Sequence, residues 1–126
     1  MVQKAREKTQ HMSNVSISIG NVDRLPFPDA TFDVVLISDA LHHLSCPEQA
    51  LHEVRRVLKK DGLFLLVDPA KETPIIVLLG WLLKPIEKAY RYYSQSMLKK
   101  LLEQEEFRVT DIERHFLNNF VFATTT

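Results

Sequence analysis

Residues 32–68, FDVVLISDALHHLSCPEQALHEVRRVLKKDGLFLLVD, decide the fold. Two short apolar runs, Phe32–Ile37 and Leu63–Val67, flank a segment in which apolar residues recur at helical spacing. Short runs rich in apolar and β-branched residues are typical of strands buried on both faces, and a strand–helix–strand order favours parallel strands with a right-handed crossover. The stretch therefore predicts a βαβ unit and an α/β sheet.

Local signals bound the helix between these strands. Ser45 is the predicted N-cap, and Pro47 and Glu48 suit the first turn. Asp61-Gly62 predicts the end of the helix, because glycine readily adopts the left-handed conformation that follows many helices. The predicted buried face of the helix is formed by Ala50, Leu51, Val54, Val57 and Leu58.

The segments before this unit predict a helix, a strand and a loop. Met1–Met12 is charged and free of proline and glycine, which favours a helix. Val15–Ile19 alternates apolar and polar residues, which is the period of a half-buried strand. Asp23–Thr31 contains Pro26 and Pro28 and is typical of a loop.

The segments after the unit end in a predicted hairpin. Ile75–Leu83 is nearly all apolar, yet it is shorter than the about 20 residues of a membrane-spanning helix. Ser94 is the predicted cap of a helix whose buried stripe is formed by Met97, Leu98, Leu101 and Leu102. Phe107–Ile112 and Phe116–Ala123 are predicted strands with a turn at Asn118-Asn119, and a hairpin makes the last strand antiparallel.

Composition excludes several classes of protein. The chain has 126 residues, enough for one domain, and its 16 basic and 16 acidic residues leave no formal net charge. Nucleic-acid binders usually carry a basic surplus, so we expect no nucleic-acid partner. One cysteine, Cys46, cannot form an intramolecular disulfide, and the first ten residues lack an apolar signal core. We expect a cytoplasmic protein.

Three short motifs between residues 25 and 43 resemble those of a known family. Leu25-Pro26-Phe27, then Phe32-Asp33-Val34-Val35, then Ala40-Leu41-His42-His43, resemble the class I S-adenosylmethionine-dependent methyltransferases. The similarity is to the small-molecule branch that includes the ubiquinone and menaquinone biosynthesis enzymes, and it covers nearly the whole chain. It implies a Rossmann-like methyltransferase sheet with a C-terminal antiparallel hairpin.

The resemblance also implies a cofactor site for S-adenosylmethionine. Asn21 would pair with the adenine edge, Val22 would offer its backbone amide to the ring, and Ser38 would contact the methionine part through its backbone. Asp39 would line the mouth of the pocket. A plainer interpretation makes Asn21 a turn-forming residue after a strand, and Asp39 a solvated loop residue.

Histidines and the cysteine offer weaker candidates. His42 and His43 would line the pocket or pack at the helix start, and one of them is a candidate general base because imidazole titrates near neutral pH. Adjacent residues point in different directions, so we expect no metal site. Cys46 is an inert thiol or, as a minor alternative, one with a lowered pKa at a helix start. We expect the remaining histidines to be surface residues: His11, His52 and His115.

The sequence does not match the N-terminal part of the family's fold. The family begins with a strand, a Gly-rich loop that holds the cofactor, and a second strand ending in an acidic residue. This chain has three glycines and no Gly-x-Gly. We therefore expect residues 1–126 to be a single partial methyltransferase domain, the C-terminal two-thirds of a truncated sheet. We expect Val15–Ile19 to pair with Phe32–Ile37 or with another chain, in a dimer or a partner that completes the sheet.

The predicted function is methyl transfer to a small, apolar or lipid-like molecule, with this chain incomplete for catalysis. The alternative is a non-catalytic interaction or regulatory module that pairs through its exposed sheet edge. A nicotinamide-dependent dehydrogenase would need a glycine fingerprint that is missing. Residues 75–93 have three open interpretations: a core helix, a lid over an apolar substrate, or a peripheral membrane contact.

Overall fold

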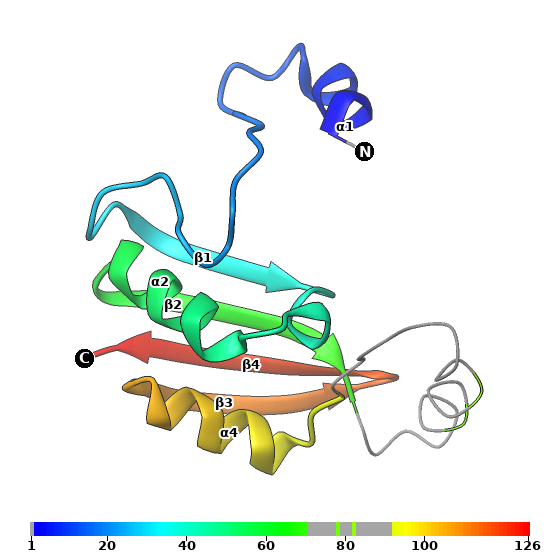
Figure 1. The fold of residues 1–126 in the computed structure, drawn as a ribbon, viewed down its shortest axis with the longest axis vertical. Helices are drawn as coiled ribbons and strands as arrows, with labels where there is room; N and C mark the ends of the chain where they lie inside the picture. The colour runs from blue at the N-terminus through cyan, green and yellow to red at the C-terminus, as the bar shows by residue number, and fades with distance from the viewer. Residues whose placement is uncertain (1, 71–77, 79–81, 83–91) are drawn as a thin grey trace.

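The computed structural model describes residues 2–70, 78, 82 and 92–126. The chain forms, in order, the elements α1 (Val2–Thr9), β1 (Phe32–Ser38), the 3-10 helix η1 (Leu41–His43), α2 (Pro47–Val57), β2 (Leu58–Pro69), α4 (Gln95–Gln104), β3 (Phe107–His115) and β4 (Asn118–Thr125). Figure 1 shows α1 joined to the rest by a long irregular stretch, with the strands stacked side by side below it.

The four strands form one sheet in the order β1-β2-β4-β3. β1 pairs parallel to β2, and α2 connects them, so the predicted βαβ unit is confirmed. β4 pairs antiparallel with both β2 and β3. The predicted C-terminal antiparallel hairpin is therefore confirmed, and it closes one side of the sheet (Figure 1).

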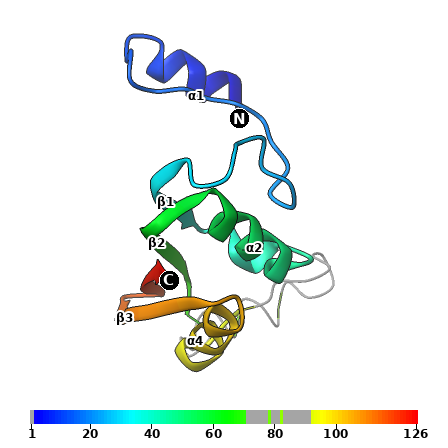
Figure 2. The ribbon, with the colours of Figure 1, turned by 90° about the vertical axis from the view of Figure 1, so that its left-hand side faces the viewer.

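Helices α2 and α4 lie on the same side of the sheet (Figure 2). Their apolar faces pack against alternate residues of the strands, as the 2.0-residue period of a strand requires. The core between these layers contains fully buried residues from both helices and both central strands, among them Leu51, Val54, Phe64, Leu66, Leu98, Leu102, Val121 and Ala123.

The outer side of β1 has no neighbouring strand among the described residues. Its inward residues Val35 and Ile37 pack against the core, whereas Val34 and Leu36 are 52% and 58% exposed. The prediction of a strand buried on both faces is therefore wrong for β1 in this structure. The described helices cover one face only, so every second apolar residue of β1 meets solvent.

The boundaries of α2 differ from the prediction. The N-cap is Cys46 and not Ser45, and it makes no side-chain capping hydrogen bond. The helix ends at Val57, four residues before the predicted stop. Leu58 leaves the helical conformation because it pairs with Phe32 on β1, and the amide of Thr31 donates to the carbonyl of Val57. Strand pairing therefore overrides the helical periodicity.

The turn at Asp61-Gly62 also differs from the prediction. Asp61 adopts the left-handed conformation, with a φ of 59°, while the φ of Gly62 is not positive. Gly62 is needed for space, since a Cβ there would lie 2.7 Å from the carbonyl oxygen of Lys59. The glycine therefore allows residue 62 to approach the backbone of Lys59 closely, just before the regular pairing of β2 begins at Leu63.

Val15–Ile19 is not a strand in this structure. No ladder pairs it with β1, so the predicted direct pairing is wrong, and four of its five residues are exposed. An alternating pattern specifies which face of a strand is buried, but the strand forms only where a neighbour supplies hydrogen bonds. Pairing of Val15–Ile19 with another chain stays a prediction.

Two details of the C-terminal part are corrected. Ser94 caps α4 as predicted, accepting a hydrogen bond from the amide of Met97, but the Met97 side chain is 45% exposed and not part of the core. The hairpin turns at Phe116-Leu117 and not at Asn118-Asn119, with Phe116 at a φ of 54° and fully exposed.

Most of residues 75–93 lies outside the described residues, so the interpretations of that segment are not decided. In it, Leu78 and Leu82 are described and are both exposed. Within the part of the chain that the structure describes, no helix has the length and apolar character to cross a membrane.

Candidate functional site

The carboxyl ends of β1 and β2 meet at one edge of the sheet because the two strands are parallel. β1 ends at Ser38, and the amide of Asp39 donates a 2.8 Å hydrogen bond to the carbonyl of Val67 on β2. Asp39 has a φ of 52°, a conformation that costs most residues free energy but that Asp tolerates. The chain therefore turns sharply at Asp39, leaves the sheet and enters η1.

This turn brings His42 over the end of β2. Its ring Nδ1 lies 3.0 Å from Oδ1 of Asp68, and both side chains are buried, at 5% and 0% exposed. Ligands of open α/β sheets bind beyond the carboxyl ends of the strands, which is where this pair lies. A buried histidine–carboxylate pair at this edge is the strongest feature of the candidate site.

Asp68 was missed by sequence reasoning, which used it only to end the strand. The available signal was an acidic residue directly after a fully apolar run, since a carboxyl group at the end of a buried strand is expensive to desolvate. Burial raises the pKa of Asp68, although its hydrogen bond with His42 opposes that shift, and the nearby Asp39 charge raises the pKa further. The second carboxyl oxygen, Oδ2, has no hydrogen-bond partner among the described residues.

Aromatic rings surround His42. The ring of Tyr92 stacks on it with centroids 5.8 Å apart, and the ring of His43 lies 4.0 Å away. His43 is exposed while His42 is buried, yet their rings lie against each other, so the expectation that the two side chains point in different directions is wrong. Within the described ranges, no group of three His, Cys, Asp or Glu side chains is arranged to hold a metal ion.

Asn21 and Val22 lie in a different loop. The Asn21 side-chain oxygen accepts a 3.0 Å hydrogen bond from the amide of Asp23, which is the turn-forming role that the sequence also allowed. Gln49, in the first turn of α2, donates to the carbonyl of Asp23. The described hydrogen bonds of this loop run to α2 and not to Ser38, Asp39 or His42. The cofactor roles of Asn21, Val22, Ser38 and Asp39 stay predictions.

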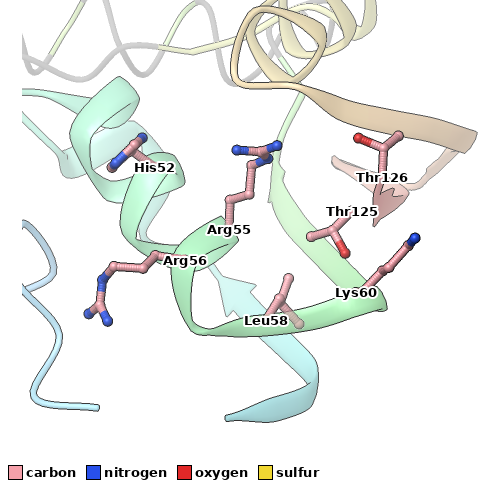
Figure 3. Close-up of a pocket in the computed structure, with 7 residues that line it drawn as sticks. All are labelled: His52, Arg55, Arg56, Leu58, Lys60, Thr125 and Thr126. Carbon is pink, nitrogen blue, oxygen red and sulfur yellow. The ribbon is translucent and has the colours of Figure 1, made fainter. Parts of the chain in front are cut away.

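The opposite end of the sheet carries a basic, solvent-open pocket of about 420 Å³ (Figure 3). Figure 3 shows Arg55 and Arg56 leaving α2 in different directions. Arg55 pairs with Glu106 at 2.8 Å, whereas Arg56 binds Glu53 and Asp29 and also donates to the carbonyls of the loop before β1. The residues that line the pocket are His52, Arg55, Arg56, Leu58, Lys60, Thr125 and Thr126.

Arg56 fixes that loop rather than offering a free cation. Its guanidinium lies 2.7–2.8 Å from both carboxyl oxygens of Glu53, and Glu53 also accepts the amide of Leu25. The Arg56 hydrogen bonds, together with that of Leu25, lower the pKa of Glu53 to about 2 although burial opposes the shift. The loop that carries Asn21 and Val22 is thereby fastened along α2.

The remaining candidates lie on the surface. Cys46 is exposed at the start of α2, with its sulfur 3.8 Å from a Glu48 carboxyl oxygen. His11, His52 and His115 are exposed, as expected, although Nε2 of His115 lies within hydrogen-bond distance, 2.7 Å, of a Glu113 carboxyl oxygen, a contact that the sequence did not reveal.

Comparison with known proteins identifies the family. The family model described as "Methyltransferase domain" matches residues 1–66, which is more than half of the chain. The methyltransferase YcgJ of Bacillus subtilis, itself described as uncharacterized, is 44% identical over 79 residues, covering 60% of this chain and 31% of that protein. The ubiquinone/menaquinone biosynthesis C-methyltransferase UbiE of Pasteurella multocida is 37% identical over 106 residues, covering 82% of this chain and 36% of that protein.

Solved structures show the same fold. A SAM-dependent methyltransferase from Aquifex aeolicus matches with a TM-score of 0.78 and 24% identity, covering 99% of this chain and 63% of that chain. The Rossmann-like sheet expected from the resemblance is thereby confirmed, and the expected cofactor agrees with the family. This chain spans about a third of the length of the curated relatives named above. By its sequence match and its fold, the chain belongs to the methyltransferase domain family.

Proposed function

We propose that this chain takes part in S-adenosylmethionine-dependent methyl transfer to a small, apolar or lipid-like acceptor. The observation that carries the proposal is that polar side chains from two segments lie together at the carboxyl ends of β1 and β2. There the exposed Ser38 and Asp39 lie next to the buried His42–Asp68 pair. This edge is where open α/β sheets bind ligands, and family membership gives the ligand class.

The described residues fit such a cofactor in two respects. Asp39 places a carboxylate in solvent at the strand end, and its charge complements a positively charged sulfonium. Asn21 uses one lone pair of its side-chain oxygen for Asp23, which leaves its NH₂ group and a second lone pair for an adenine edge. When bound, the cofactor would supply a methyl group carried on a positively charged sulfur. The sulfur would keep the electron pair of the broken carbon–sulfur bond and become neutral.

The chain's own residues then have positioning tasks. An in-line displacement needs aligned reactants and a dry site more than it needs charged catalytic groups. In this proposal the backbone of Ser38 and Asp39 lies beside the methionine part of the cofactor at the end of β1. His42 and His43 remain the candidates for contact with the acceptor, and either accepts its proton or holds it by a hydrogen bond.

We further propose that residues 1–126 correspond to the C-terminal two-thirds of a methyltransferase domain and bind the cofactor only weakly alone. The unpaired outer edge of β1 and the coverage of 63% of the Aquifex aeolicus chain support this proposal. Isothermal titration with S-adenosylmethionine tests it. We expect no micromolar binding, and a micromolar dissociation constant for this chain alone would overturn the claim that it is a partial site.

Amide chemical shifts test the site itself. Addition of millimolar S-adenosylhomocysteine to ¹⁵N-labelled protein should shift the amide signals of Asn21, Val22, Ser38 and Asp39. Asp39→Asn should weaken the response, whereas Asp33→Asn should not, because Asp33 is an exposed aspartate in the same strand, remote from its carboxyl end. Shifts confined to the basic pocket at Arg55 and Lys60, or no shifts at all, would overturn the placement.

A second candidate function is a non-catalytic module that pairs with a longer methyltransferase. The observation in its favour is the open edge of β1, where Val34 and Leu36 are more than half exposed. Co-purification with such a partner, lost on Val34→Lys and retained on the exposed control Met97→Lys, would support this function. Methyl transfer by the chain alone would exclude it.

The peripheral membrane contact through residues 75–93 also stays a proposal. Leu78 and Leu82 lie four residues apart, which is one helical face, and both are exposed. Sedimentation with anionic lipid vesicles tests it, and a Leu78→Glu, Leu82→Glu double variant should abolish that sedimentation.

A further inference from the structure

Three buried polar side chains line up at the carboxyl end of β2. His42 comes from η1, Asp68 from β2 and Asn119 from β4, and all three are at most 4% exposed. Asp68 and Asn119 are directly opposite in the antiparallel β2–β4 ladder, so their side chains project from the same face. Opposite residues have Cβ atoms about 4.5–5.5 Å apart, which is within the reach of two short side chains.

Two oxygen atoms in this group find no donor in the part of the chain that the structure describes. Asp68 accepts from His42 through Oδ1, while its Oδ2 has no such partner. Asn119 donates from Nδ2 to the carbonyl of Tyr93 at 3.2 Å, while its Oδ1 has none either. Both oxygens are acceptors when Asp68 is ionised, and two buried acceptors beside each other repel. A single proton placed between them satisfies both.

We propose that Asp68 is held as the neutral acid, with Oδ2 donating to Oδ1 of Asn119 and Oδ1 accepting from Nδ1 of His42. The hydrogen bonds then run in one direction, from His42 to Asp68, to Asn119 and to the Tyr93 carbonyl. In this series of hydrogen bonds, each donor faces an acceptor and each acceptor faces a donor. Nδ1 of His42 carries its proton, and Nε2 is the acceptor nitrogen of the ring.

The ionised alternative is less well satisfied. Asn119 would have to turn its amide by 180°, so that Nδ2 faces Asp68 and Oδ1 faces the Tyr93 carbonyl, which would place two acceptors together. Burial has the largest effect on Asp68 and raises its pKa. The hydrogen bonds and charge of His42 act in the opposite direction, and the negative charge of Asp39, which follows β1, adds a smaller upward shift. Asn119, opposite Asp68 on β4, carries no charge.

The consequence concerns His42. An ionised aspartate would stabilise a positively charged imidazole, whereas a neutral acid orients the ring without doing so. Asp68 is thereby a positioning residue that orients the His42 ring without adding a negative charge beside it. This orientation places the His42 ring at the end of the sheet where the methyl acceptor would bind, a step that rests on the proposed function.

Nuclear magnetic resonance tests the proton placement without any ligand. In protein carrying ¹³C-labelled aspartate, the Asp68 carboxyl carbon should have the shift of a protonated acid at pH 7. Long-range ¹H–¹⁵N spectra should show His42 as the Nδ1–H tautomer. An ionised Asp68 at pH 7, or an Nε2–H or doubly protonated His42, would overturn the proposal.

Two variants separate positioning from simple packing. Asp68→Asn supplies an NH₂ donor to Asn119 and a carbonyl acceptor to His42, so it should reproduce the wild-type tautomer. Asp68→Ala removes both and should lose it. If Asp68→Asn also loses the tautomer while remaining folded, the proposal is wrong. If Asp68→Ala does not fold, the carboxyl shift of the wild type and the Asn variant still decide the question.

The two proposals fail in distinguishable ways. If Asp68 is ionised or His42 is not the Nδ1–H tautomer, while S-adenosylhomocysteine still shifts the expected amide signals, the cofactor site is supported and only the proposed protonation of Asp68 is wrong. If Asp68 is protonated and His42 is the Nδ1–H tautomer, but S-adenosylhomocysteine shifts none of the expected amide signals, the proposed protonation is supported and the proposed role of this site in methyl transfer is wrong.

Discussion

Each end of the β1–β2 pair has one buried carboxyl group, and the pKa values of the two groups shift in opposite directions. Glu53, near the amino end, accepts from Nε and Nη2 of Arg56 and from a backbone amide, and its pKa falls to about 2. Asp68, at the carboxyl end, accepts one bond from a histidine within a buried setting, and its pKa rises. Burial acts in the same direction on both, so the number and charge of the donors decide the outcome.

The difference separates a structural site from a candidate functional one. The Glu53–Arg56 pair fastens the loop before β1 to α2 and leaves no unmet hydrogen bond on the Glu53 carboxylate. Oδ2 of Asp68 finds no donor among the described residues, and it lies at the end of the sheet where ligands of such sheets bind. Perturbed carboxyl groups with incomplete partners are more often found where chemistry occurs.

The largest effect should come from a second acid at the carboxyl end. Asn119→Asp would place two carboxyl groups opposite each other in a buried setting, so we expect a loss of roughly 3 kcal/mol in the free energy of unfolding at pH 7. The loss should diminish at acidic pH, where both groups are protonated. Urea denaturation measures it, and an equal loss at pH 4 and pH 7 would contradict the explanation.

A smaller effect is expected at the amino end. Glu53→Gln retains one acceptor for Arg56 but removes the charge, so the free energy of unfolding should fall by about 1.5 kcal/mol at pH 7. Proteolysis in the loop of residues 21–30 should become faster because its fastening is weakened. Gln49→Ala, which removes one hydrogen bond of the same loop, is the milder control.

The two carboxyl groups should impose opposite pH dependences. The folded pKa of Glu53 lies below its ordinary 4.5, so its stabilisation is present above pH 4.5 and lost as the pH falls toward 2. The folded pKa of Asp68 is raised, so its stabilisation is full below its ordinary 3.8 and lost as the pH rises through the folded value. Stability measured against pH should lose its acid-side slope in Glu53→Gln and its decline at higher pH in Asp68→Asn.

The smallest effect is expected from Asp33→Asn. Asp33 pairs with Lys59 at 2.8 Å on the surface, and the Lys59 hydrogen bond lowers the pKa of Asp33, but both side chains are largely exposed. Exposed ion pairs contribute little because solvent screens them. We expect no measurable change in thermal midpoint, and a clear change would show that exposure is a poor guide to these carboxyl groups.

Much of the fold could be predicted from local patterns. The apolar runs at residues 32–37 and 63–67, the helical spacing between them and the closing hairpin are properties of short segments, and all appear in the structure. Details that depend on pairing were not predictable. Leu58 has the spacing of a helix residue, yet it begins β2 because Phe32 lies beside it. Val15–Ile19 has the pattern of a strand, yet it lacks a neighbour among the described residues.

The candidate site divides in the same manner. His42 was accessible as a candidate because it belongs to a recognisable motif after an apolar strand. Asp68 and Asn119 lie 26 and 77 residues after it and carry no shared motif, so only the β2–β4 register reveals that they adjoin. The prediction that grouped Asn21 and Val22 with Ser38 and Asp39 has no described contact in its support.

The sequence by itself determined the α/β class, the parallel pair, the family and the histidine at the strand end. These follow from periodicity and from motifs that are contiguous in the chain. The tertiary structure alone decided that Asp68 is buried with one oxygen for which the described residues supply no donor, while both carboxyl oxygens of Glu53 accept hydrogen bonds. Burial and donor number depend on what other segments bring to a side chain, and no local pattern specifies that.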